Sequence, residues 1–237
     1  MRRRDVAVTL PWMGAGTEFL LREVAALPDD ALADPSRLPG WSRAHVVAHV
    51  ARNAEALVRL ATWARTGVET PMYTDREQRA RDIEESARNP VETLREELAN
   101  TAAELDAALA ALDERSWQAS VRTAANRPIP ATEVPWMRVR EVWLHAVDLD
   151  AGAELTDVPP DVVESLLDDA TGTLSAQPDC PSVRLAATDR DRSWTLGQDS
   201  GIEVRGTAAD LLGWLIGRCG GERLDADGPI PNPPRWL

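Results

Sequence analysis

Apolar residues recur at helical spacing through the first 150 positions of the chain, and the pattern is clearest after Asn89-Pro90. From there to about Leu112, five leucines fall on one stripe of a helix, at positions 94, 98, 105, 109 and 112. Charged and small residues occupy the positions between them. The spacing therefore predicts an amphipathic helix that buries one face.

Further runs before residue 152 also predict helices, although one of them, at residues 75–88, is highly charged and has few apolar anchors. Ser42 suits an N-cap, and Gly67 suits the first position after a helix end. Pro135 is acceptable in a first turn, and Gly152 would close the last run. Residues 127–130, Arg-Pro-Ile-Pro, read as a polar connector. The predicted helices are residues 9–26, 42–66, 75–88 and 135–151.

The pattern changes after Gly152. One more helix is predicted at residues 161–175, and three short, partly β-branched runs separated by polar turns then predict strands. Thr207 suits the N-cap of a helix over residues 208–218, and the Pro-rich tail is expected to be irregular. We therefore expect an α+β protein, with a helical bundle at residues 1–152 and a small α/β domain at residues 153–237. The predicted strands are residues 182–188, 192–196 and 202–205.

Charge and cysteine content exclude several classes of function. The chain has 237 residues, which suits one large domain or two modest ones, and a net charge of −13. An acidic surface repels phosphate backbones, so we expect no nucleic-acid partner. Only two cysteines occur, Cys180 and Cys219, and they are too few for a disulfide framework or a Cys-rich zinc module.

No apolar run is long enough to span a bilayer, so no membrane partner is expected. The basic start, Met1 to Asp5, lacks the apolar stretch and cleavage site of a secretory signal. We therefore expect a cytoplasmic protein. Its size and acidic surface are compatible with a monomer, which is our expectation for the assembly.

The candidate chemistry lies in the histidines. All three occur in two i,i+4 pairs, His45 with His49 and Glu141 with His145, on two different predicted helices. Residues four apart share a helix face, and facing helices of a bundle commonly build a metal site this way. Imidazole with one carboxylate suits zinc, and also nickel, iron or manganese. Three protein ligands would leave one coordination position open, as catalytic sites require.

The spacing leaves alternatives open. It does not decide whether His45, His49 or both would bind a metal, and an i,i+4 histidine pair also occurs by chance. Glu141 could equally be a solvated helix carboxylate. Asp148, close after His145, is either a partner of the imidazole or a charge near a helix end.

These residues stand in stretches that resemble the mycothiol-dependent maleylpyruvate isomerases, a family within the DinB-like superfamily of helical-bundle metal proteins. The resemblance covers nearly the whole chain and includes the order of the two domains. It implies a DinB-like four-helix bundle followed by a small α/β domain. The stretches that carry it are LPGWSRAHVVAHVARNAEAL at residues 38–57, VREVWLHAVDL at 139–149 and GTAADLLGWLIGR at 206–218.

The resemblance implies that His49, Glu141 and His145 bind zinc or another divalent metal, with His45 as a pocket neighbour. It also implies that Arg218 is a catalytic arginine, although an arginine at a helix end is favoured by the helix dipole alone. Arg79 is a candidate contact of the thiol cofactor, but its surroundings match the family loosely, and a solvated charge in a charged helix is the simpler interpretation.

The implied activity is thiol-dependent cis–trans isomerisation of maleylpyruvate. A thiolate adds to the double bond, the resulting single bond rotates, and the thiolate departs. The resemblance implies mycothiol as the thiol, and a metal with an open position would lower the pKa of its sulfur. Arg218 offers a planar fork for a substrate carboxylate. The partners expected are therefore a small-molecule substrate and this thiol.

Three alternatives remain open at this point. The same site would serve a mycothiol S-transferase that adds the thiol to another electrophile. A non-catalytic protein that binds a metal or small ligand is a second alternative, which a closed four-ligand site including His45 would favour. A catalytic Cys219 beside Arg218 is a third, but it would have no histidine left as its base.

Overall fold

The structure is a computed structural model that describes residues 3–198 and 201–236. Met1, Arg2 and Leu237, which belong to the predicted start and end of the two domains, lie outside the described residues. The chain forms two compact units, the first ending at Ala153 and the second beginning at Glu154. The first unit is mainly helical and the second contains a small sheet with helices, so the predicted α+β class is confirmed.

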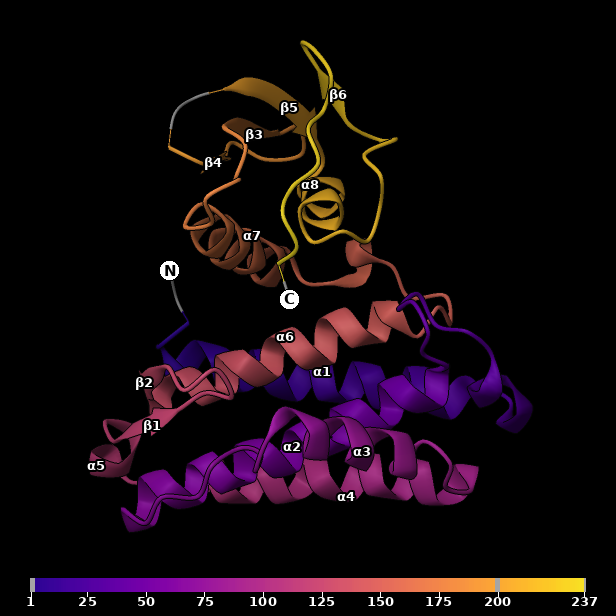
Figure 1. The fold of residues 1–237 in the computed structure, drawn as a ribbon, viewed down its shortest axis with the longest axis vertical. Coiled ribbons are helices and arrows are strands. Elements are labelled where there is room, and N and C mark those ends of the chain that lie inside the picture. The colour runs from indigo at the N-terminus through magenta and orange to yellow at the C-terminus, as the bar shows by residue number, and fades with distance from the viewer. Residues whose placement is uncertain (1–2, 199–200, 237) are drawn as a thin grey trace. The chain divides into compact units, whose positions relative to one another are not determined.

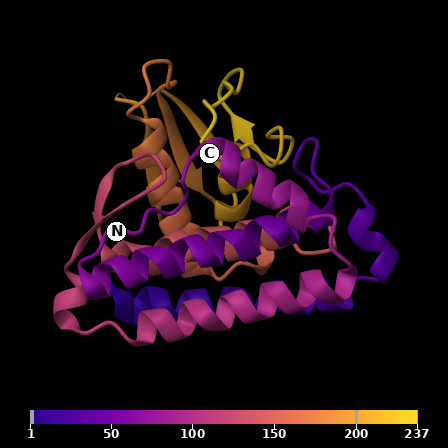
Figure 2. The same cartoon turned by 60° about the horizontal axis from the view of Figure 1, so that its bottom comes forward.

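Four helices form the bundle of the first unit (Figure 1): α1 (Val6–Ala26), α2 (Arg43–Thr66), α4 (Val91–Ala110) and α6 (Val134–Asp148). Helix α2 packs against α4 and α6, and α1 packs against the same two helices. Figure 2 shows α4, in magenta, running beside α1 and α2. The predicted leucine stripe of α4 is buried in this core. A charged helix, α3 (Arg76–Ser86), packs on α2, and a 3₁₀ turn, η1 (Asp29–Ala33), follows α1.

Side-chain caps set where these helices begin and end. Ser42 is the N-cap of α2 as predicted, and Gly67 ends it with a φ of +74°, in the left-handed region that favours glycine. Asp75 caps α3. Helix α1 begins at Val6, three residues before the predicted start, because the Asp5 side chain accepts a hydrogen bond from the Ala7 amide.

The segment between α4 and α6 differs from the prediction. The expected connector at residues 127–130 contains a strand, β2 (Pro128–Pro130), which pairs antiparallel with β1 (Ser120–Arg122) after the short helix α5 (Glu114–Trp117). Prolines hold the chain extended, and Ile129 pairs with Val121 in the interior. A 3₁₀ turn, η2 (Ala131–Glu133), leads into α6, which ends at Asp148 rather than residue 151.

Close packing of α1 on α6 fixes the position of the helix that carries Glu141 and His145. A Cβ atom at Gly16 would lie 2.5 Å from Cγ2 of Val142 and 2.6 Å from Nε1 of Trp143. The Trp143 indole donates a hydrogen bond to the carbonyl of Trp12 at 3.0 Å and stacks on Phe19. Only glycine at position 16 therefore permits this approach.

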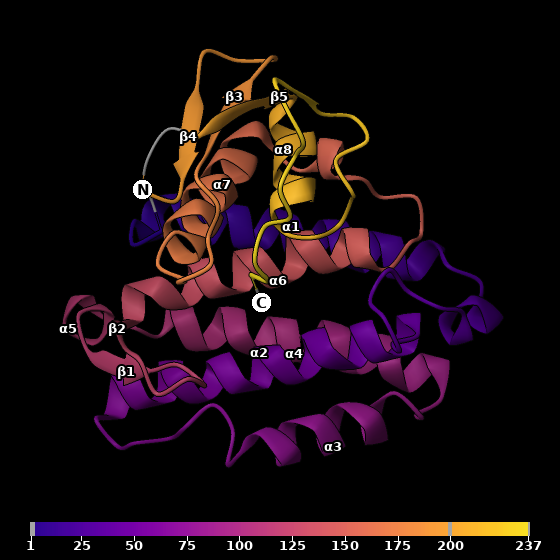
Figure 3. The same cartoon turned by 45° about the horizontal axis from the view of Figure 1, so that its top comes forward.

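In the second unit, helices α7 (Pro160–Leu174) and α8 (Ala208–Leu215) lie on one face of a sheet (Figure 3). The strand order is β4-β3-β5-β6, with β3 and β5 parallel and the other pairs antiparallel. Helix α8 ends at Leu215 and not at residue 218, because Gly217 turns the chain with a φ of +72°. The expected irregular tail contains the last strand. The strands are β3 (Val183–Ala187), β4 (Ser193–Leu196), β5 (Ile202–Gly206) and β6 (Asp225–Ala226), and a 3₁₀ turn, η3 (Leu155–Asp157), precedes α7.

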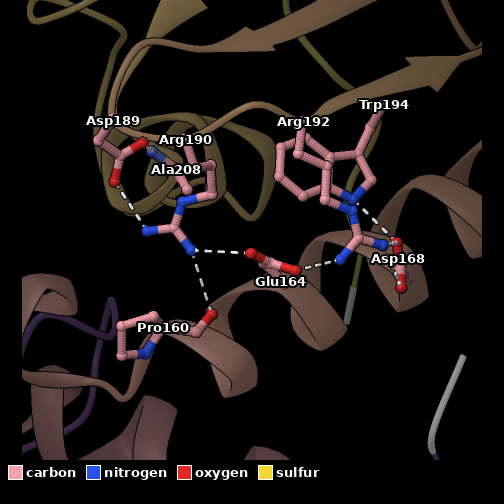
Figure 4. Close-up of polar contacts among 8 residues, drawn as sticks. All are labelled: Pro160, Glu164, Asp168, Asp189, Arg190, Arg192, Trp194 and Ala208. Atoms are coloured by element: carbon pink, nitrogen blue, oxygen red, sulfur yellow. Dashed lines mark hydrogen bonds and ion pairs between the residues drawn. The ribbon is translucent and has the colours of Figure 1, made fainter.

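A polar network ties the turn between β3 and β4 to both helices of this unit (Figure 4). On α7, Asp168 accepts hydrogen bonds from Arg192 at 2.7 Å and from the Trp194 indole at 2.8 Å. Glu164, one turn earlier, pairs with Arg190 and Arg192. Asp189 accepts a hydrogen bond from the first amide of α8, that of Ala208. These contacts hold the turn in place. Each carboxylate of the network pairs with an arginine, since Asp189 also pairs with Arg190.

None of the helices within the described residues is long and apolar enough to cross a membrane.

Candidate metal centre

Three potential metal ligands meet between α2 and α6. His49 lies in the second turn of α2, and Glu141 and His145 lie one turn apart on α6, so both α6 side chains leave the same face of that helix. Since α2 and α6 pack together, the three side chains converge inside the bundle. One ligand atom from each lies within 4.8 Å of the others.

Both imidazoles are directed at the same carboxylate oxygen. Nε2 of His49 lies 2.9 Å from Oε2 of Glu141, and Nε2 of His145 lies 3.2 Å from that atom. The two rings are perpendicular, with centroids 4.7 Å apart. His49 is buried, and the Glu141 and His145 side chains are 21% and 13% exposed. The cluster is therefore partly accessible to solvent through the Glu141 and His145 side chains.

Asp148 orients His145 from the other side of its ring. Oδ2 of Asp148 lies 2.9 Å from Nδ1 of His145, and the Asp148 side chain has no exposed surface. An ionised carboxylate only accepts, so Nδ1 carries a ring proton, and Nε2 is the nitrogen that can lose its proton to a cation. This arrangement holds an imidazole ready to coordinate a cation.

Charge on the cluster is balanced by protons when no cation is bound. Burial alone would lower the pKa of His145, but hydrogen bonds to Asp148 and Glu141 raise it to about 9. Burial lowers the pKa of His49 more than its contact with Glu141 raises it. Burial would raise the pKa of Glu141, yet the two imidazoles hold that pKa well below its ordinary value. A divalent cation among the three groups would take the place of the His145 proton, so the donor set fits such an ion.

His45 lies outside this cluster. Its Nδ1 atom is 2.7 Å from Oγ of Ser42 and 3.2 Å from the Ser42 amide nitrogen, completing a capping box at the start of α2. Its Nε2 atom lies 3.1 Å from Oε2 of Glu84 on α3. Both ring nitrogens therefore have partners away from Glu141, and the geometry distinguishes the two histidines that spacing alone could not.

Arg79 of α3 does reach the cluster. Its Nη2 atom lies 3.2 Å from Nδ1 of His49, and its guanidinium lies 5.6 Å from the ring centroid of Tyr73. Burial raises the pKa of Tyr73, and the neighbouring Arg79 opposes that rise. Trp41 covers His49 from another side, with ring centroids 5.4 Å apart. No sequence pattern indicated a site role for Tyr73 or Trp41, although Trp41 stands in the Pro-Gly-Trp-Ser segment before the histidines.

The remaining predicted residues belong to the second unit. Arg218 follows α8, and its Nη1 atom donates a hydrogen bond to the carbonyl of Ile216 at 3.0 Å, near the helix end. Burial raises the pKa of Cys219 despite the opposing effect of Arg223, and burial also raises the pKa of Cys180. Neither thiol has the lowered pKa of a catalytic cysteine.

A four-helix bundle with two imidazoles and a carboxylate on facing helices defines the protein as a bundle protein with a candidate metal centre. The family model for the mycothiol maleylpyruvate isomerase N-terminal domain matches residues 13–150. The model for the C-terminal domain of the same family matches residues 157–235. The chain belongs to the mycothiol maleylpyruvate isomerase family.

Solved structures agree with this assignment. The chain is 34% identical to a crystallised mycothiol-dependent maleylpyruvate isomerase, with a TM-score of 0.91, over 98% of this chain and 97% of that one. A variant of that enzyme with one histidine replaced by alanine gives the same values. No curated protein matches the chain.

Proposed function

We propose that the protein is a mycothiol-dependent maleylpyruvate isomerase that acts at a zinc site formed by His49, Glu141 and His145. The observation that carries the proposal is the convergence of these ligand atoms within 4.8 Å. They converge in a chain that is similar to such an isomerase over 98% of its length. Two imidazoles and one carboxylate form a common zinc ligand set, and three ligands leave a coordination position open.

Several residues of the chain have separate roles at the proposed site. A cation held by His49, Glu141 and His145 would lower the pKa of the thiol, which would then provide the nucleophile for reversible addition to the double bond. Asp148 fixes the tautomer and orientation of His145. Glu141 supplies negative charge beside both imidazoles, and Trp41 shields His49 from water. The buried setting strengthens each of these interactions.

The nucleophile is proposed to come from the cofactor and not from the protein. Burial raises the pKa of both Cys180 and Cys219, so neither is activated. Arg79, which touches His49 and stacks on Tyr73, is proposed to contact the bound thiol. Its five N–H donors suit the many oxygen acceptors of a small polar thiol.

Arg218 is proposed to bind a carboxylate of the substrate through its planar guanidinium. Replacing it with methionine should lower kcat/KM for the substrate and leave metal content unchanged. Arg223→Met, a change of the same kind at an exposed position in the same unit, is the control and should keep full activity. Equal activity of the two variants would remove Arg218 from the proposed site.

The proposed setting is the cytoplasm and the proposed assembly is a monomer. Size-exclusion chromatography with light scattering tests the monomer. The measured mass should equal that of one chain, 25.9 kDa. A dimer mass at micromolar concentration would contradict it.

The decisive experiment is isomerisation of maleylpyruvate by the zinc-loaded protein, with and without mycothiol. Turnover that requires the thiol would support the proposal. Absence of turnover in protein that contains one equivalent of metal would contradict it. Consumption of free thiol with a different electrophile would then identify the protein as a mycothiol S-transferase.

A further inference from the structure

Arg138 is a charged residue of α6 whose side chain is buried within the bundle, with 1% of its surface exposed. It precedes Glu141 by three residues and so shares a helix face with that ligand. Its side chain crosses to α2, where Nη1 donates to the carbonyl of Val50 at 2.7 Å and to Oδ1 of Asn53 at 3.0 Å. Val50 immediately follows His49. Arg138 thus connects the backbone beside one ligand to the turn before another.

Burial of this guanidinium is costly. Moving a cation out of water without an ion pair in direct contact is unfavourable, and apolar residues of similar volume are often tolerated better at such positions. Nε and Nη2 of Arg138 have no hydrogen-bond partner within the described residues. Burial lowers the pKa of Arg138 to about 10, although Glu141 and Asp106 oppose that shift. The contribution of Arg138 to the stability of the bundle therefore does not explain why an arginine occupies this position.

A second arginine crosses between the same helices at the other side of the cluster. From the start of α2, Nε of Arg43 donates to the carbonyl of Leu149 at 2.7 Å, and Nη2 donates to that of Asp150 at 2.6 Å. The three ligands lie between the Arg43 and Arg138 cross-links. Hydrogen bonds to carbonyls are directional, so each cross-link resists translation of one helix along the other.

We infer that Arg138 is a positioning residue of the metal centre, which fixes the register of α6 against α2 so that Glu141 meets His49. A slip of one residue along α6 is about 1.5 Å and would break both hydrogen bonds of Arg138. It would also move Oε2 of Glu141 away from Nε2 of His49, which now lie 2.9 Å apart. The inference rests on the proposed metal site, because the register of α6 against α2 matters for function only if His49, Glu141 and His145 hold a cation.

Titration of the metal-stripped, full-length protein with Co²⁺ tests this role without using enzyme activity. Cobalt has a d–d spectrum that reports the coordination geometry, and its affinity reports how well the ligands are placed. The variants are Arg138→Met, Arg138→Lys and Asn53→Ala. The matched control is Arg95→Met, which removes a half-buried arginine that links α4 to Leu27 and Asp29, away from the cluster. Urea unfolding measures the stability of each variant.

Arg138→Met should weaken Co²⁺ binding by about 10- to 100-fold, the range typical of groups that support metal ligands, and should change the d–d spectrum. Arg138→Lys and Asn53→Ala each retain part of the link and should show smaller losses in the same direction. Arg95→Met should lower stability and leave affinity and spectrum unchanged. The two milder variants decide the question if Arg138→Met does not fold.

The inference is overturned if the Arg138 and Asn53 variants bind Co²⁺ with wild-type affinity and spectrum. It is also overturned if Arg95→Met weakens binding as much, since general loss of stability would then explain the effect. Failure of the wild-type protein to bind Co²⁺ would instead remove the proposed metal site itself. The wild-type titration therefore separates the failure of the site from the failure of the positioning role.

Discussion

The carboxylate of Asp148 lies 2.9 Å from Nδ1 of His145 and is completely enclosed by protein. Because His145 is three residues earlier on α6, the pair is set by the geometry of a single helix. A buried carboxylate on one nitrogen of an imidazole determines which nitrogen is available to a cation. The proposed ligand and the carboxylate that orients it are therefore encoded within one helical turn of sequence.

Replacement of Asp148 by asparagine tests this orientation. The amide keeps the shape of the side chain but loses the negative charge that favours a proton on Nδ1 of His145. We expect zinc affinity to fall by about 10- to 100-fold. Competition with a chromogenic chelator measures the affinity. Unchanged affinity in a correctly folded Asp148→Asn protein would show that the hydrogen bond does not support the metal site.

His145→Ala removes a proposed ligand and should reduce bound metal well below one equivalent. His45→Ala is the matched control, because His45 lies four residues from a ligand but hydrogen-bonds Ser42 and Glu84. The control should retain its metal and lose a little stability with the capping box. Elemental analysis of both proteins measures the result. Full metal content in His145→Ala would refute the ligand set.

Arg79→Met should separate thiol binding from metal binding. Arg79 can only donate, so its contact with His49 uses Nδ1 as the acceptor, whereas binding of a cation at Nε2 places the ring proton on Nδ1. The contact therefore does not assist coordination through Nε2. We expect the variant to keep one equivalent of metal and to show a higher KM for mycothiol. Loss of metal from Arg79→Met would show that the arginine supports the ligand instead.

The pH dependence of the unfolding free energy reports the protonation of His145 in the metal-free protein. Folding raises the pKa of His145 from 6.5 to about 9, so this group stabilises the fold fully below pH 6.5 and loses that effect as the pH rises through 9. The pKa of His49 is lowered, so its influence is confined to pH values below 6.5. The unfolding free energy of the metal-free protein should therefore fall between pH 6.5 and 9.

Urea unfolding at the two ends of this pH range measures the change. The zinc-loaded protein should lack the decrease, because a coordinated imidazole carries no proton at that nitrogen. Metal-free His145→Ala is the second control and should also lack it. A pH-independent unfolding free energy in the metal-free wild type would contradict the assigned protonation of His145.

Gly16→Ala should destabilise the bundle by about 1–3 kcal/mol, because the added methyl group meets Val142 and Trp143 of α6. Gly14→Ala, two residues earlier in the same helix, meets no atom within 4 Å and should stabilise by up to about 1 kcal/mol. Urea unfolding compares the two variants. Equal effects would show that α1 does not approach α6 as closely as described.

Much of this architecture could be predicted from local sequence, because caps and apolar periodicity act over a few residues. Ser42 and Thr207 cap the starts of helices and Gly67 ends one, as predicted, and the predicted leucine stripe is buried. The β1–β2 pair was missed because Pro128 and Pro130 indicate a break, while their partner strand lies several residues earlier. The extended conformation that proline favours became a strand only because Val121 was available to pair with Ile129.

The site was predicted less completely because its geometry depends on contacts between distant segments. Helical spacing placed Glu141 and His145 together but could not separate His45 from His49. That distinction depends on His45 occupying the third position of α2, within reach of Ser42. The acceptors of Arg138 lie on another helix, 88 and 85 residues away in sequence, so no local pattern pointed to it.

Helix α3 has a consequence for how the buried imidazoles meet solvent. Of its side chains only Ile83 and Ser86 are buried, and it is held largely by polar contacts, such as those of Glu84 with His45 and of Ser86 with Glu97. Segments with so few buried apolar contacts open locally at a small fraction of the global unfolding free energy. Backbone amides of α3 should therefore exchange with deuterium well before those of α2. Detachment of this one short helix would remove Arg79 from His49 and expose that imidazole further, while the bundle core stays folded.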